Sequence, residues 1–323
     1  MIARRALLAA ASSAPLPRIA RAQNAWPTRP VRVVVGFAAG GGTDITTRAV
    51  APRMQAALGQ PIVVDNRPGG GGWPATEQVM RAAPDGYTLM MGTIASLVIA
   101  PVMSAPAFAA ERDLTPIGLS VDVLNILVVP ADRPWRSAAD LIAAARARPA
   151  TLAYGSSGVG SAGHLAGALF DRMAGIETVH VPYRGGGQLI ADIVSGKVDF
   201  AFATAATTIP HIEAGRLRAL GVPMARRSAI LPDIPTVAEA ASLPGFDVAN
   251  WYALLGPRGL PAPIVERANA ALTEALRDPA IAASLAHHGL EPRPSTPAEL
   301  ARFLREERET WAPIIRATGA RPD

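Results

Sequence analysis

The chain has 323 residues, of which 50% are hydrophobic and only 5% aromatic, and this length and composition predict a globular protein of two domains. The absence of cysteine excludes disulfides, thiolate metal sites and a cysteine nucleophile. The net charge is +5, but four of the 31 basic residues lie in the first 22 positions, so the remainder carries 27 basic and 26 acidic residues and lacks the basic tract that nucleic-acid binding requires.

The first 22 residues have the pattern of an export signal. Arg4 and Arg5 precede an apolar stretch at residues 6–14, and Ala20 and Ala22 supply the small residues of a signal-peptidase site. The apolar stretch is far shorter than the ~20 residues that span a bilayer. We therefore expect export to the periplasm by the general or the twin-arginine route, with cleavage after Ala22.

Short β-branched runs then alternate with helical segments, which predicts parallel sheets covered by helices on both faces. Ser137 and Asp140 predict a capping box at one helix start, and Thr296 and Glu299 predict another. The last helix carries apolar residues from Leu300 to Ile315 on one face. The predicted strands are 31–35, 62–64, 88–91, 126–129, 152–154, 178–181 and 198–202.

Three glycine clusters stand out, at residues 40–42, 69–72 and 155–163. The first and third each follow a predicted strand and open a predicted helix. Free backbone N–H groups and the positive helix end favour an anion at such a junction, although glycine also serves in tight turns. Both loops are therefore candidate anion sites, and hydroxyls rather than a lysine would complete them, since Lys197 is the only lysine in the chain.

Nucleotide binding and catalysis have weaker support. Gly158, Gly160 and Gly163 match G-x-G-x-x-G, but the match lies in mid-chain, and the acid at a suitable distance, Glu177, precedes a strand instead of ending one. The sequence contains no Walker motif, no nucleophile elbow and no H-E-x-x-H. His164, at the start of the helix after the third cluster, could bond a ligand or a loop carbonyl. We expect no catalysis, no cofactor and no metal.

Motifs in a fixed order along the chain resemble one known family. They are VRVVV at 31–35, GGGTD at 40–44, VDNRPGGGG at 64–72, DGYTL at 85–89, LTPI at 114–117, SAGHLAG at 161–167, VPYRGGG at 181–187, LPDIPTVAE at 231–239 and WY at 251–252. The chain resembles the Bug-type extracytoplasmic solute-binding proteins of tripartite tricarboxylate transporters over essentially its whole mature length.

The resemblance implies an α/β fold of the periplasmic-binding-protein type II, with two doubly wound lobes, an interlobe ligand cleft and two crossing strands. We place the crossings near 124–129 and 249–255. Residues 26–123 plus 250–323 would then form the first lobe and residues 124–249 the second. Closure of the lobes would bring the two glycine loops onto one ligand.

The resemblance also implies a site for a small carboxylate, held by N–H groups, hydroxyls and waters. Asp44 could equally cap a helix, and Tyr183 could equally serve packing. The candidate ligand-binding residues are Phe37, Gly41, Gly42, Thr43, Asp44, Thr93 and Ser96 in the first lobe, and Ser156, Ser157, Gly160, Ser161, His164, Tyr183 and Thr204 in the second.

The sequence departs from the family pattern at four positions, where Ala39, Leu97, Ala100 and Ala203 stand in place of proline, histidine, asparagine and aspartate. An aspartate could accept a hydrogen bond from an ammonium group, and Ala203 cannot. If these positions line the cleft, the ligand is expected to be a carboxylate without an α-amino group and with an apolar or aromatic remainder.

We expect a monomer that delivers its ligand to the membrane permease subunits of a tripartite tricarboxylate-type transporter. Two alternatives remain open at this point. The chain could be a ligand-binding accessory of a membrane sensor kinase, which would share the fold and cleft. It could also be an exported oxidoreductase that binds a nucleotide at Gly158 to Gly163.

Overall fold

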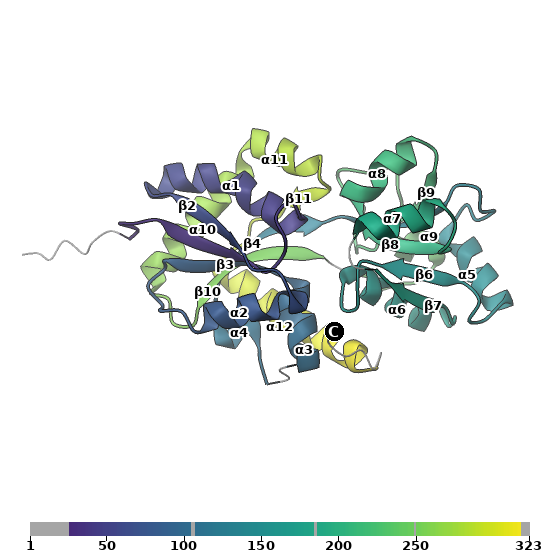
Figure 1. Cartoon of the computed structure of the whole chain (residues 1–323), viewed down its shortest axis with the longest axis horizontal. Coiled ribbons are helices and arrows are strands. Elements are labelled where there is room, and N and C mark those ends of the chain that lie inside the picture. The colour runs from purple at the N-terminus through teal and green to yellow at the C-terminus, as the bar shows by residue number, and fades with distance from the viewer. Residues whose placement is uncertain (1–25, 105–106, 184–185, 249, 318–323) are drawn as a thin grey trace, which may run out of the picture.

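The computed structural model describes residues 26–104, 107–183, 186–248 and 250–317, and these form two α/β lobes (Figure 1). The expected signal segment lies outside the described residues. Among the described residues, no helix combines the length and the apolar character needed to cross a membrane.

The first lobe is built on a six-stranded sheet in the order β11-β4-β10-β3-β1-β2. Strands β1, β2 and β3 run parallel to one another, and β10 lies antiparallel between β3 and β4. The strands are β1 (Val31–Val35), β2 (Ile62–Asn66), β3 (Thr88–Thr93), β4 (Leu114–Val123), β10 (Trp251–Pro257) and β11 (Leu290–Pro292).

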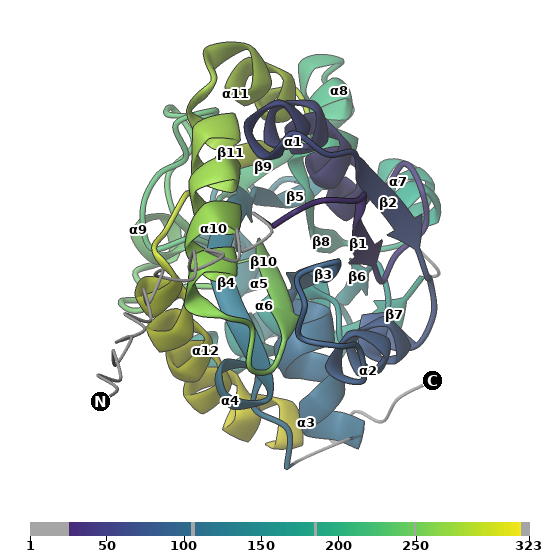
Figure 2. The same ribbon diagram turned by 90° about the vertical axis from the view of Figure 1, so that its left-hand side faces the viewer.

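Helices cover both faces of this sheet (Figure 2). Alternate residues of β1 point to opposite faces, so Val33 packs with α1, α10 and α11 while Val34 packs with α2 and α12. The helices of the first lobe are α1 (Gly42–Leu58), α2 (Trp73–Met80), α3 (Ala100–Ser104), α4 (Ala110–Asp113), α10 (Ala262–Arg277), α11 (Pro279–Ala286) and α12 (Pro297–Ala317), with the single-turn segments η1 (Gly70–Gly72) and η2 (Ala95–Ile99).

The second lobe has a five-stranded sheet in the order β7-β6-β8-β5-β9, with α5, α6 and α9 on one face and α7 and α8 on the other. Its central apolar side chains are aromatic, with Phe170, Phe200 and Phe202 in contact. Its elements are β5 (Asn125–Pro130), α5 (Ala138–Ala147), β6 (Ala153–Ser156), α6 (Ala162–Ala174), β7 (Val179–Pro182), α7 (Gly186–Val194), β8 (Phe200–Thr204), α8 (Ala205–Glu213), β9 (Leu217–Gly221) and α9 (Val237–Ala241).

All seven predicted strands are present, with ends shifted by at most two residues. The capping box of Ser137 and Asp140 is confirmed, and Thr296 and Glu299 exchange the expected bonds at the start of α12. Strand β10 corresponds to the crossing strand expected near 249–255, and three further strands were not predicted. Proline and glycine interrupt the apolar run of β4, β9 carries Arg218 at its second position, and β11 has only three residues.

The chain crosses between the sheets twice, and the two crossings lie side by side. Leu124 separates β4 from β5; its N–H donates to the Gly289 carbonyl of the first lobe and its carbonyl accepts from the Ala205 N–H of the second. On the return, the Asn250 carbonyl accepts from the Val123 N–H. On this basis we propose the lobe boundaries at 123/124 and 249/250.

Candidate ligand-binding site

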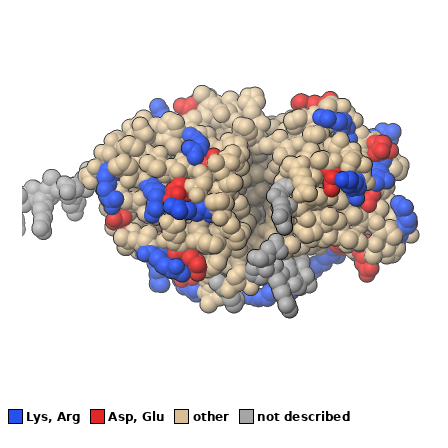
Figure 3. Space-filling model, viewed as in Figure 1, with Lys and Arg blue, Asp and Glu red and all other residues tan. Residues whose placement is uncertain are grey.

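The candidate site lies where the carboxyl ends of two sets of parallel strands face each other. In open α/β sheets, ligands bind in the crevice outside these ends. The loops after β1, β2 and β3 mark this edge in the first lobe, and those after β6, β7 and β8 mark it in the second. A Cβ added at Gly160 after β6 would lie 3.1 Å from Ile99 Cγ2 after β3, so the two edges meet. Figure 3 shows a groove between the lobes.

The first glycine cluster forms the entrance to α1. Gly41 is the N-cap, and its own N–H donates to the Ala38 carbonyl. Helix geometry leaves the N–H groups of the first turn without an intrahelical acceptor. Among the described residues, those of Gly42, Thr43 and Asp44 have no hydrogen-bond partner. This turn therefore offers three donors and the positive end of a 17-residue helix.

Asp44 holds this loop in place. Its carboxylate accepts from the Gly40 N–H at 2.9 Å, from Arg48 Nε at 3.0 Å and from Asn66 Nδ2 at 3.0 Å. Burial raises the pKa of Asp44, but the bonds from Arg48, Gly40 and Asn66 together bring it below its ordinary value. The carboxylate stays ionised and engaged with its own loop, which favours the capping interpretation of this residue.

Two more predicted positions lie at the end of β3. The Thr93 and Ser96 side chains bond each other's backbone N–H groups at 3.2 and 3.0 Å, and both residues are buried. Thr93 lies opposite Tyr252 of β10. Burial raises the pKa of Tyr252 to about 12, although a hydrogen bond with Thr43 acts against this. Thr43, Tyr252 and Thr93 thus form one polar group beside α1.

The second glycine cluster belongs to the same edge, which the sequence did not indicate. Gly72 ends η1 and opens α2, with a φ of +86° that a side chain rarely adopts. A Cβ there would lie 2.9 Å from Ser96 Cβ and 3.2 Å from the Phe37 ring. The half-buried Phe37 and buried Ser96 therefore depend on glycine at position 72 for their placement.

In the second lobe, the loop after β6 is held by its own residues. The Ser156 hydroxyl donates to the Gly158 carbonyl at 3.0 Å, and the Ser161 hydroxyl caps α6 by accepting from the His164 N–H at 3.2 Å. The Gly160 N–H donates to His164 Nδ1 at 3.2 Å, so it is already engaged. Among the residues described around this loop, the N–H groups of Ala162 and Gly163 have no partner.

The remaining predicted residues of this lobe differ in placement. Ser157 is exposed at the loop surface. The Tyr183 hydroxyl donates to Asp192 of α7 at 3.1 Å, and burial raises the pKa of Tyr183. Thr204 is the N-cap of α8, with its hydroxyl 3.0 Å from that of Thr207. Tyr183 is therefore tied to a helix of its own lobe, and Thr204 stands at a helix entrance.

The four departures from the family pattern give little support to the expected ligand preference. Ala39 is exposed, whereas Leu97 packs in the core of the first lobe, where its Cδ1 would lie 2.6 Å from a Cβ at Gly92. Ala203 lies in the core of the second lobe, and Ala100 packs near Gly71. The side chains of Leu97 and Ala203 therefore give no support to the prediction that the ligand lacks an α-amino group.

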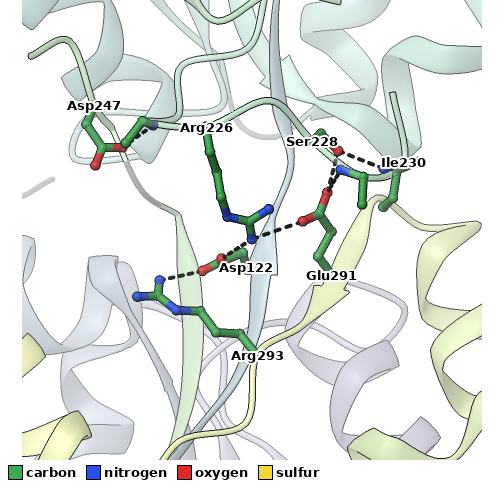
Figure 4. Close-up of polar contacts among 9 residues, drawn as sticks. Asp122, Arg226, Ser228, Ile230, Asp247, Glu291 and Arg293 are labelled. Atoms are coloured by element: carbon green, nitrogen blue, oxygen red, sulfur yellow. Dashed lines mark hydrogen bonds and ion pairs between the residues drawn. The ribbon is translucent and has the colours of Figure 1, made fainter. Parts of the chain in front are cut away.

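Beside the crossings, charged residues join the lobes (Figure 4). Arg226 of the second lobe reaches Asp122 at 3.5 Å and Glu291 at 3.3 Å, and Arg293 bonds Asp122 at 2.8 Å. Glu291 also accepts from the Ser228 hydroxyl and from the Ala229 N–H. Asp122 and Glu291 are buried, and burial raises the pKa of Asp122.

The described residues contain no group of three or more histidines and carboxylates that could hold a metal ion. The two helix entrances instead offer unpaired N–H groups, hydroxyls and a neutral histidine on either side of one groove. Such groups bind an anion without a fixed countercharge. The geometry defines a solute-binding protein of two lobes.

Comparison with known proteins identifies the family. Residues 46–320 match the family model of the tripartite tricarboxylate transporter family receptor, and the chain belongs to this family. It is 37% identical to the UPF0065 protein in the tcbD-tcbE intergenic region of Pseudomonas sp. (strain P51), over 97% of this chain and 94% of that protein. It is 33% identical to the protein BugT of Bordetella pertussis, over 92% and 91%.

Solved structures agree in fold. Rpa4515 of R. palustris, described with adipate, superposes with a TM-score of 0.80 at 36% identity, over 91% of this chain and 98% of that one. MatC of Rhodopseudomonas palustris, described with bound malate, gives 0.77 at 32% identity, over 90% and 100%. The expected family and the periplasmic-binding-protein fold are confirmed.

Proposed function

We propose that this protein binds a small carboxylate, most simply a dicarboxylate, between its two lobes in the periplasm. It then releases the ligand to the permease subunits of a tripartite tricarboxylate transporter. The observation that carries the proposal is the pair of helix entrances with unpaired N–H groups, one from each lobe, at the facing carboxyl ends of the parallel strands. Family membership and the adipate and malate complexes of two relatives support the same ligand class.

Capture by lobe closure suits this arrangement. Each entrance alone offers only a few donors, and closure would place both sets on one ligand while excluding water. The N-terminal export pattern and the periplasmic description of a related structure support the location. Gly158 to Gly163 do not favour the oxidoreductase alternative, because the Gly160 N–H, which a pyrophosphate would need, is engaged with His164.

A thermal-shift and calorimetric screen of the processed protein tests the ligand class. The panel holds malate, succinate, adipate, citrate, aromatic acids and aspartate, with adipamide as the uncharged match of adipate. A true ligand at ~100 times its dissociation constant should add about 2.7 kcal/mol to the free energy of unfolding. Equal binding of adipate and adipamide, or binding of no acid in the panel, would contradict the proposal.

Small-angle scattering with and without the best ligand tests closure. A bound ligand should lower the radius of gyration, because the lobes approach each other. Co-purification with the tagged protein as bait tests the partner, with permease subunits of this transporter type and a sensor kinase as the two candidates. Ligand-dependent capture of the kinase alone would replace the transport role by the sensor alternative.

A further inference from the structure

His180 lies on β7, outside the glycine loop, and its ring reaches the loop through Ser156. His180 Nε2 is 2.7 Å from the Ser156 hydroxyl oxygen. That hydroxyl has one hydrogen, which it donates to the Gly158 carbonyl at 3.0 Å, and its oxygen also accepts from the Gly158 N–H at 3.3 Å. All three contacts are hydrogen bonds at once only when the His180 nitrogen is the donor, with its proton on Nε2, and we adopt this arrangement.

A second histidine holds the other side of the same loop. His164 Nδ1 accepts from the Gly160 N–H at 3.2 Å, so its proton is on Nε2. The two imidazole rings stack on each other, with centroids 4.2 Å apart and planes at 22°. Tyr154 stacks on His180 at 4.8 Å. Gly160, with a φ of +75°, is thus bonded directly to His164, whereas Gly158, with a φ of +136°, is linked to His180 through Ser156.

We propose that His180 is a positioning residue for ligand binding, which acts through Ser156 to hold the Gly158 to Gly160 loop in the form that leaves the first turn of α6 open to a carboxylate. The proposal rests on the proposed function, because it concerns the same site. Without the His180 donor, the Ser156 hydroxyl loses one of its fixed partners. The loop would then sample other conformations, and binding would have to order it.

The protonation states agree with this arrangement. Burial, with a contribution from His164, lowers the pKa of His180 to about 4, and burial also lowers the pKa of His164. Both rings are therefore neutral at pH 7, as the donor and acceptor pattern requires. The remaining neighbours in these contacts, Ser156 and Tyr154, are uncharged at this pH.

Three variants of the full processed chain separate the hydrogen bond from the ring. His180→Phe keeps a ring for stacking but removes the donor, and His180→Gln keeps a donor but removes the ring. Ser156→Ala removes the acceptor. His287→Phe, an exposed histidine of the first lobe, is the control. Malate and adipate affinities are measured by calorimetry and melting temperatures by scanning calorimetry.

We expect His180→Phe to weaken binding about tenfold, which is roughly 1.4 kcal/mol. His180→Gln should recover binding to within about threefold of the wild type, and His287→Phe should leave it unchanged. The double variant Ser156→Ala/His180→Phe should bind no more weakly than Ser156→Ala alone. Wild-type affinity in His180→Phe, failure of His180→Gln to rescue, or additive losses would each overturn the proposal.

Amide resonances of Gly158 and Gly160 give a readout that does not depend on the ligand. In His180→Phe both should move or broaden while those of the first lobe stay in place, and unchanged resonances would overturn the proposal. Binding of no carboxylate by the wild type would contradict the proposed function instead. The resonances would then still decide whether His180 orders the loop.

Discussion

The two lobes meet in two regions of opposite chemistry. At the groove, Gly160 of the second lobe lies against Ile99 of the first, and the groups nearby are unpaired backbone N–H groups, hydroxyls and the neutral, stacked imidazoles of His164 and His180. Beside the crossings, the contacts are ionic, with Arg226 between Asp122 and Glu291. A site that takes up and releases an anion gains from donors that carry no fixed countercharge, whereas a junction that stays joined can use buried charges that are permanently paired.

The largest expected effect is a loss of ligand affinity when the groove between the lobes is disrupted. Gly160→Leu forces a side chain onto a φ of +75° and places its Cβ 3.1 Å from Ile99 and 3.2 Å from Met103. We expect carboxylate affinity to fall at least about 100-fold, or roughly 2.7 kcal/mol. Gly187→Leu is the matched control, because its Cβ would meet nothing within 4 Å and its φ is not positive. Calorimetry with adipate compares the two, and equal binding by Gly160→Leu and the wild type would contradict the two-loop site.

The next largest effect is a loss of stability when the ionic contacts beside the crossings are removed. Glu291→Ala removes the acceptor of Arg226, Ser228 and the Ala229 N–H, which should lower the free energy of unfolding by about 2–3 kcal/mol. We expect ligand affinity to change by less than about threefold. Urea unfolding and calorimetry measure the two quantities. Arg302→Ala is the control, since it breaks an exposed pair within α12 that should matter by less than about 0.5 kcal/mol. A loss of affinity with no loss of stability in Glu291→Ala would reverse the assigned roles.

A third effect concerns alkaline pH. The Glu307 carboxylate accepts from Trp251 Nε1 at 2.7 Å, and burial raises its pKa to about 7 from an ordinary 4.5. The folded state holds this proton more tightly, so the contribution to stability is present below about pH 4.5 and is lost as the pH rises through 7. Glu307→Gln stays neutral, and we expect it to gain on the order of 2 kcal/mol over the wild type at pH 8. Urea unfolding from pH 5 to 8.5 tests this, and parallel profiles would refute it.

The smallest effect lies at acid pH on the groove side. The pKa of His180 is lowered to about 4, so the unfolded chain takes up a proton first. Stability from the neutral ring is therefore present above about pH 6.5 and is lost as the pH falls toward 4. His180→Gln should show a flatter fall of melting temperature between pH 6.5 and 4.5 than the wild type does. An identical fall would show that the pKa of His180 is the same in the folded and unfolded states, which would contradict the prediction.

Much of the fold could be predicted because it depends on local pattern. Runs such as 31–35 are apolar at every position but Arg32, as is typical of buried parallel strands, and the capping box at Ser137 lies within four residues. The glycine cluster at 40–42 also correctly predicted the start of a helix. For Asp44, the sequence allowed either ligand contact or capping, and the bonds from Gly40 and Asn66 favour capping.

The rest depends on contacts between distant positions. Arg293 and Asp122 are 171 residues apart, and Ser228 and Glu291 are 63 apart, so no local spacing links them. The cluster at 69–72 gave no sign that Ser96 and Phe37 would pack on it, because that requires the pairing of β1 with both β2 and β3. The contact between Ser156 and His180 could not be predicted for the same reason, because it depends on the pairing of β6 with β7.

The two adjacent crossings also bear on the order in which the protein folds. Strand β10 lies between β3 and β4, but it follows the whole second lobe in the sequence. During synthesis, the sheet of the first lobe therefore lacks one of its central strands until residue 257 has appeared. Residues 125–221 already contain every strand of their own sheet by then. The second lobe can thus form early, while the first waits for long-range pairing, which is the slower kind of contact to make.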